Sequence, residues 1–189
     1  MDGNILHRDI SENNIIITDL KKTGFAGMLI DMDLAKELGS GRSGARCRTG
    51  TMEFMAIEVL LNIDHTYRHD PESFFYVFLC QCGRRGWEFV RDSKSQPIPS
   101  LLIKWYTGSY REMASTKRGR MQIDGFEDIL EEFPPYFHCL KPFCRELRGV
   151  LFPYRKGLFL GTSKDPNVLY EPNIKAFDKA IEGIRDNGG

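Results

Sequence analysis

A run of seven consecutive apolar residues, Phe74 to Cys80, constrains the fold of this chain more than any other feature. It follows Pro71 and has the length of a helix, but it is apolar on every side. Such a helix must be surrounded by other elements. The chain has 189 residues, which is long enough to bury a helix in a core of its own. We therefore expect a mainly α fold, a helical bundle around one buried helix.

Apolar periodicity predicts the surrounding helices and leaves irregular stretches between them. Further helices are expected at Ile98–Trp105, Tyr110–Lys117, Phe126–Phe133, Phe137–Leu151 and Ile174–Arg185. Loops are expected at Lys36–Thr51, at Arg84–Pro99 and, because of its spaced prolines and glycines, at Phe152–Pro172.

A short β-hairpin is predicted near the N-terminus. The β-branched run Asn13–Thr18 has the composition of a strand, residues 19–24 read as a turn, and Gly27–Ile30 supplies a second short strand. Because the outer ends of a hairpin lie side by side, polar residues that flank the two strands should converge.

Charge and cysteine content narrow the class of protein. Lys plus Arg and Asp plus Glu both number 26, so nothing suggests a nucleic acid or an anionic membrane as a partner. No apolar stretch approaches the roughly 18–20 residues that cross a bilayer, and no signal peptide is visible. The five cysteines form an odd set, which we interpret as reduced thiols: Cys47, Cys80, Cys82, Cys139 and Cys144. An intracellular protein of the cytoplasm or nucleus is expected.

The segment His7 to Asn14 reads His-Arg-Asp-Ile-Ser-Glu-Asn-Asn. His-Arg-Asp with a trailing Asn is the pattern of a protein kinase catalytic loop. A tight loop before a strand would point Asp9 at a substrate hydroxyl and bring the side-chain oxygen of Asn14 to a metal ion. The alternative is that Asp9 and Asn14 are ordinary turn residues, and His7 a packed core histidine.

Three further segments follow in the order expected of a kinase. Leu29 to Ala35 contains Asp31-Met-Asp at the end of the second strand, where a kinase places its metal-binding Asp-Phe-Gly. Gly50 to Glu58 is similar to the end of an activation segment, with Ile57 in place of the usual Pro. His69 to Ser73 opens the buried helix with an Asp at its second position. A capping turn is the alternative for Asp31.

Together these segments resemble the fungal-type protein kinase family. The sequence details on which this resemblance rests are Ser11, the Asp-x-Asp form at Asp31, and His-Asp-x-Glu-Ser-Phe-Phe from His69. The stretch from Lys104 to Lys117 is also similar to that family. The resemblance covers residues 4 to 120. It implies a protein kinase-like C-terminal lobe over residues 1–151, with 152–189 as a C-terminal extension or the last helix of the same domain.

The resemblance also implies roles for individual residues. Asp9 would be the catalytic base, and Asn14 and Asp31 would hold Mg²⁺ on ATP. Arg8 would contact a phosphorylated or acidic residue of the activation segment, with Ser40, Ser43 and Thr49 as candidates. The structural roles implied are a hydrogen bond near Asp9 for Thr51, an arginine partner for Glu58 (Arg145 or Arg148), and an anchor for the catalytic loop in Asp70.

Only six residues precede His7, and no Gly-x-Gly-x-x-Gly or Val-Ala-Ile-Lys occurs in the chain. In a kinase these motifs precede the catalytic loop and grip ATP. We therefore expect impaired phosphotransfer by this chain alone, and an exposed apolar face where the missing lobe would sit. That face predicts self-association.

Three functions stay open. The first is phosphotransfer to Ser or Thr of a protein substrate. The second is a non-catalytic, pseudokinase-like module that binds a protein partner. The third is a small-molecule kinase, because Asp-x-Asp also occurs in such relatives; Arg8 and the segment Gly50 to Glu58 argue against it.

Overall fold

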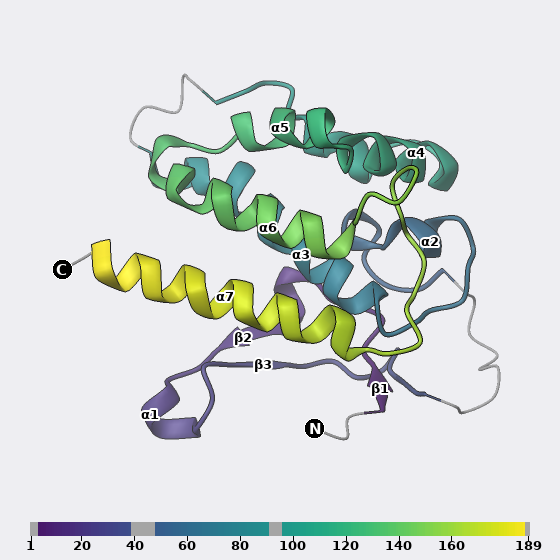
Figure 1. Cartoon of the computed structure of the whole chain (residues 1–189), viewed down its shortest axis with the longest axis horizontal. Coiled ribbons are helices and arrows are strands. Elements are labelled where there is room, and N and C mark those ends of the chain that lie inside the picture. Colours follow the sequence, from purple (N-terminus) through teal and green to yellow (C-terminus); the bar gives the residue numbers. More distant parts are fainter. Residues whose placement is uncertain (1–3, 39–47, 91–95, 188–189) are drawn as a thin grey trace.

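Helices dominate the computed structural model, which describes residues 4–38, 48–90 and 96–187 (Figure 1). The mainly helical fold with a short N-terminal hairpin is therefore confirmed. The α-helices are α1 Leu20–Thr23, α2 Ile57–Leu60, α3 His69–Gly83, α4 Tyr110–Arg120, α5 Ile123–Glu131, α6 Lys141–Leu151 and α7 Asn167–Asn187. Short 3₁₀ helices occur at Glu12–Asn14, Met52–Phe54, Arg85–Phe89, Leu101–Trp105 and Pro135–Leu140.

Helix α3 is the centre of the core, as its sequence predicts. Phe75, Tyr76 and Leu79 are at most 1% exposed. The Tyr76 ring meets the buried Trp105 edge-on at 5.0 Å, and the Phe75 ring lies 5.9 Å from Phe126. Dense packing of this kind makes α3 rigid, so that the start of the helix can hold the loops that contact it in place.

The first turn of α3 also buries a carboxylate. Glu72 is completely buried and pairs with Arg68, which is itself 3% exposed. Its other oxygen accepts from the Ile57 amide at 2.7 Å and from the Tyr76 hydroxyl at 2.8 Å. Burial alone would raise the pKa of Glu72, but Arg68, His69 and these donors outweigh it and hold that pKa below its usual value. The group is thus ionised and satisfied, and it ties α2 to α3.

The predicted hairpin consists of β2 Ile15–Ile17 and β3 Gly27–Leu29, which are antiparallel with Ile16 opposite Met28. Helix α1 connects them. Asp19 caps it by accepting from the Lys21 amide at 3.0 Å, and Gly24 ends it at φ 80°, a left-handed conformation that glycine adopts without strain. The hairpin lies outside the helical core. Large apolar side chains in and beside it are therefore exposed: Ile16, Ile17, Leu20, Phe25, Met28, Leu29, Ile30 and Met32.

A second small sheet was not predicted. β1 Ile5–Leu6 pairs antiparallel with β4 Lys36–Glu37, so the expected loop from Lys36 begins as a strand. A strand of two residues is too short to show an alternating pattern, which explains why the sequence gives no sign of it. The sheet brings the residues before His7 against those after Asp31.

The C-terminal helix begins earlier than predicted. α7 starts at Asn167 and contains Pro172, inside the stretch that was expected to be irregular. Proline removes one backbone donor near the start of the helix, and Asn173 donates its side-chain amide to the Leu169 carbonyl at 2.7 Å. Phe177 packs α7 onto the rest of the core through Phe74, Phe78 and Phe143. In Figure 1, α7 runs beside α6 on the side where β1 and the hairpin lie.

Other expectations have mixed outcomes. The predicted loop at Arg84–Pro99 begins as the 3₁₀ helix Arg85–Phe89, because the Trp87 side chain is buried and donates to the Glu132 carbonyl at 2.8 Å. Cys80, Cys82 and Cys144 are buried free thiols and Cys139 an exposed one, whereas Cys47 lies outside the described residues. Within the described ranges, no helix is both long and apolar enough to span a membrane.

Candidate active site

Asp70 holds the segment that contains the His-Arg-Asp motif. Its two carboxylate oxygens accept from the backbone amides of His7 at 2.7 Å and Arg8 at 3.0 Å. This is the anchoring contact that the resemblance implied for Asp70. Burial raises the pKa of this carboxyl, against the lowering effect of the two amide hydrogen bonds. The loop is therefore attached to the first turn of α3, the helix at the centre of the core.

The backbone at Arg8 is strained. Its φ is +71°, a region that costs a residue with a side chain on the order of 1 kcal/mol or more. Gly50 lies against it at φ +101°, and a Cβ at Gly50 would come within 2.5 Å of the Arg8 carbonyl oxygen. Only glycine fits this contact, which explains the glycine that opens the segment Gly50 to Glu58. The close approach places Thr51 beside Asp9.

Two groups orient the Asp9 carboxylate. Oδ1 accepts from the Thr51 amide at 2.8 Å and from the Thr51 hydroxyl at 2.9 Å, which is the contact expected of Thr51. The Asn14 side-chain amide donates to the Asp9 carbonyl at 2.9 Å and lies 3.4 Å from Oδ2. Oδ1 is thus occupied by two donors, whereas Oδ2 retains acceptor capacity. Such a carboxylate can receive a proton from a hydroxyl held next to it.

The hairpin brings Asn14 and Asp31 to one end. The Ile30 amide donates to the Asn14 carbonyl at 3.0 Å, and the Ile30 carbonyl lies 2.9 Å from Nε2 of His7. Asp31 follows directly, exposed, with φ +62°. His7 is 4% exposed, as expected of a structural histidine. The arrangement places an exposed carboxylate next to the loop that carries Asp9.

The available donors are of the kind that magnesium prefers. Because the nitrogen of the Asn14 amide is used by Asp9, its side-chain oxygen is left as an acceptor, and Asp31 adds an exposed carboxylate. In the described part of the chain, no group of three or more His, Cys, Asp or Glu is arranged to hold a metal. Magnesium nevertheless binds through one or two protein oxygens together with waters and phosphates. The two residues therefore fit Mg²⁺ bound to a nucleotide.

Arg8 is a buried cation with few partners. It is 8% exposed, its Nη1 is 3.4 Å from the Leu34 carbonyl, and its Nε has no hydrogen-bond partner among the described residues. Thr49, a candidate for its contact, also has a buried hydroxyl that is unpaired within the described ranges. Ser40 and Ser43, the other candidates, lie outside the described residues. The implied contact of Arg8 thus stays a prediction.

The prediction that Glu58 pairs with an arginine is wrong. Glu58 pairs with Nε2 of His69 at 3.0 Å. Arg145 pairs instead with Glu127 at 2.7 Å, and Arg148 donates to the Met121 carbonyl at 2.6 and 2.8 Å. The physical reason is that Met121 caps the C-terminus of α4, where unpaired carbonyls attract a cation.

Lys117 is a site residue whose function the sequence did not reveal. It is completely buried, and its Nζ donates to the carbonyls of Glu53 at 2.8 Å and Met55 at 2.7 Å. The rings of Tyr76 and Trp105 lie 4.3 and 5.5 Å away. Lys117 therefore fixes the chain just after Thr51. The family-like stretch from Lys104 to Lys117 was the available signal, but a lysine in a polar helix gives no sign of burial.

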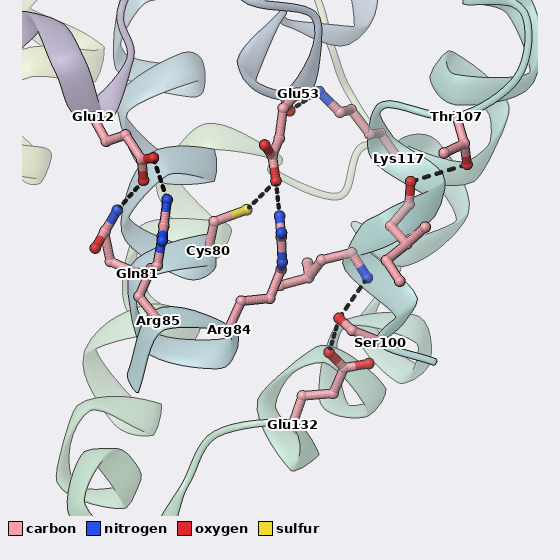
Figure 2. A network of polar contacts seen from close by, with 12 residues as sticks. Glu12, Glu53, Cys80, Gln81, Arg84, Arg85, Ser100, Thr107, Lys117 and Glu132 are labelled. Atoms are coloured by element: carbon pink, nitrogen blue, oxygen red, sulfur yellow. Dashed lines mark hydrogen bonds and ion pairs between the residues drawn. The ribbon is translucent and has the colours of Figure 1, made fainter. Parts of the chain in front are cut away.

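A polar network joins the site to the far end of α3 (Figure 2). Glu12, in the loop that follows Asp9, contacts Gln81 and pairs with Arg85 at 2.9 Å. Glu53 pairs with Arg84 and accepts from the Cys80 thiol at 3.6 Å. The catalytic loop and the segment after Thr51 are thus both held against α3.

The chain was also compared with known proteins. The model of a family described as fungal protein kinase matches residues 1–82, which contain the segment His7 to Asn14, the hairpin, the segment Gly50 to Glu58 and most of α3. A search of curated proteins finds no match.

Burial makes Lys117 a source of pH dependence. Loss of hydration lowers its pKa from 10.5 to about 7, against the raising effect of Glu72, Cys80 and Glu53. Between these two values the unfolded chain binds more protons than the folded protein, so stability should rise with pH. We expect the free energy of unfolding to rise between pH 7 and 9 by up to roughly 1.4 kcal/mol per pH unit more in the wild type than in Lys117→Met. Urea unfolding measures this, and parallel pH profiles would contradict it.

Proposed function

We propose that the chain carries the catalytic lobe of an ATP- and Mg²⁺-dependent protein kinase acting on Ser or Thr, on the basis of the match of residues 1–82 to the model of the fungal protein kinase family. The observation that carries the proposal is the orientation of Asp9. Its Oδ1 is saturated by Thr51, while its Oδ2 remains able to accept a proton. A substrate protein would be the partner.

The residues would divide the work of phosphoryl transfer. Asp9 orients the attacking hydroxyl and takes its proton as the oxygen–phosphorus bond forms and the bond to the leaving ADP breaks. Asn14 and Asp31 would hold Mg²⁺, which neutralises charge on the phosphates when bound. Thr51 fixes the Asp9 carboxylate, and Asp70 fixes the loop. Arg8 would receive the anionic group of a phosphorylated activation segment, with Ser40, Ser43 and Thr49 as candidates.

Phosphotransfer by residues 1–189 in isolation should be weak. They contain neither a Gly-rich phosphate loop nor the strand lysine that contacts ATP phosphates. Ser11 also stands where many Ser/Thr kinases have a lysine that touches the transferred phosphate. Since catalysis in this class depends on positioning and electrostatics, the loss of these contacts costs rate.

A second function, an interaction module, is favoured by one observation, the exposed apolar surface of the hairpin. Ile17 is 89% exposed, Leu20 59% and Phe25 48%, and Met28 and Met32 are also exposed. Several large apolar side chains exposed on one short hairpin favour a contact with another protein. We propose that this hairpin surface binds a protein partner, and that in its absence the chain associates with itself through it.

The catalytic proposal predicts a specific loss at Asp9. In single-turnover labelling of Ser/Thr peptides from MgATP, Asp9→Asn should lower the rate about 100-fold or more, because it removes the proton acceptor. Asp33→Asn is the matched control. Asp33 contributes only its backbone amide, 3.4 Å from Asp31 Oδ1. The labelling rate of Asp33→Asn should therefore stay within about twofold of the wild-type rate. Equal labelling by wild type and Asp9→Asn would contradict the proposal, and absent labelling by a folded wild type would favour the interaction module.

The hairpin surface predicts an effect on molecular mass. In size-exclusion chromatography with light scattering, the wild type should elute above the monomer mass at tens of micromolar, whereas the variant with Ile17→Glu and Met28→Glu should elute as a monomer. The control is Phe89→Glu, at a 77% exposed phenylalanine outside the hairpin, which should behave as the wild type does. A monomeric wild type would contradict self-association.

A further inference from the structure

A pocket of about 540 Å³ lies between α7 and the segment that leads into the catalytic loop. Ile5, Leu29 and Met32 line it on one side, and Phe74, Tyr170 and Phe177 on the other. Its volume falls within the range of about 300–1,000 Å³ typical of small-molecule sites, and its walls are mostly apolar and aromatic, as in such sites. The proposed phosphotransfer makes no use of it.

Several polar residues in its walls retain hydrogen-bond acceptors. His7 is 4% exposed, and its Nε2 donates to the Ile30 carbonyl at 2.9 Å; in the tautomer with its hydrogen on Nε2, Nδ1 is an acceptor. That Nδ1 is buried and has no hydrogen-bond partner among the described residues. Asn173 also lines the pocket. Its amide nitrogen is bonded to Leu169, which leaves its side-chain oxygen as an acceptor.

Another polar residue of the lining is Asp70, whose carboxylate lies in no ion pair among the described residues. Each of its oxygens accepts one backbone amide of the catalytic loop, and a carboxylate oxygen can accept a second donor. No ion pair within the described ranges includes Asp70. A partly buried carboxylate in apolar surroundings is stabilised by a cation that enters with its own donors.

We propose that this pocket binds a primary arylalkylamine. The ammonium group supplies up to three donors to the acceptors of this wall, and its charge complements the Asp70 carboxylate. The aryl group matches the aromatic walls formed by Phe74, Tyr170 and Phe177, whose faces also attract a nearby cation. An anionic ligand is disfavoured, because its charge would face the Asp70 carboxylate.

Such a ligand would act on the catalytic loop. His7 and Asp70 line the pocket and also hold the loop, through the Ile30 carbonyl and the amides of His7 and Arg8. Occupation of the pocket therefore stabilises the anchored conformation, with slower hydrogen exchange at the His7 and Arg8 amides. The inference does not depend on the proposed phosphotransfer, since binding is measured without nucleotide.

Three ligands of one shape test the proposal by titration calorimetry with the full chain. Tryptamine should bind, 3-ethylindole should bind at least tenfold more weakly, and indole-3-propionate should not bind detectably. The substitution Asn173→Leu should lower the affinity for tryptamine about tenfold without lowering the affinity for 3-ethylindole. The control Ile181→Ala, on the same helix but outside the pocket lining, should change neither.

The possible outcomes separate clearly. Equal affinity for tryptamine and 3-ethylindole, or an unchanged affinity in Asn173→Leu, would overturn the assignment of an amine site. Absence of tryptamine binding to folded wild type would overturn the proposal as a whole. Asp9→Asn should bind tryptamine as the wild type does, and a loss there would show that the amine occupies the catalytic site instead.

Discussion

The two hydrogen bonds from the amides of His7 and Arg8 to Asp70 connect the candidate site to the helical core. They fix a loop whose backbone is strained at Arg8, and they do so from the first turn of the helix around which the core is packed. The burial of Asp70 raises its pKa, so the two amides also keep a costly carboxylate satisfied. The remaining contacts of the loop build on this attachment.

A second set of contacts fixes the segment that faces the loop. Gly50 allows the chain to approach the Arg8 carbonyl, which brings Thr51 to Asp9. Lys117 then holds the next residues through the carbonyls of Glu53 and Met55, from inside the core. The candidate base is thus positioned from two directions, by groups that belong to different helices. The hairpin with Asp31 is less constrained, because its strands lie outside the core.

Those features that depend on local pattern could be predicted from the sequence. The apolar run from Phe74 predicts the buried helix and the β-branched run predicts the hairpin, whereas the contacts of Thr51 and Asp70 were implied by the resemblance to the fungal-type protein kinase family. Features that depend on tertiary packing could not. The sheet of β1 and β4 has strands of two residues, and Pro172 lies inside helix α7, where the sequence pattern does not favour a proline.

Charged residues were the hardest to interpret. Glu58 was expected to pair with an arginine, but the nearest buried partner is His69, one residue before Asp70. Arg148 is drawn to the end of α4 instead. Lys117 reads as a solvated helix residue, yet it is enclosed by two rings and two carbonyls. The packing between helices decides which residue a charged side chain pairs with. A single sequence does not reveal this packing.

The measurement that most directly tests the account is calorimetric titration of ATP with magnesium into residues 1–189, beside the variants Asp31→Ala and Asp33→Ala. The account predicts measurable binding that requires magnesium, is abolished in Asp31→Ala and is retained in Asp33→Ala. Binding that is indifferent to Asp31, or no binding by a protein shown to be folded, would contradict a nucleotide site and leave the chain as an interaction module.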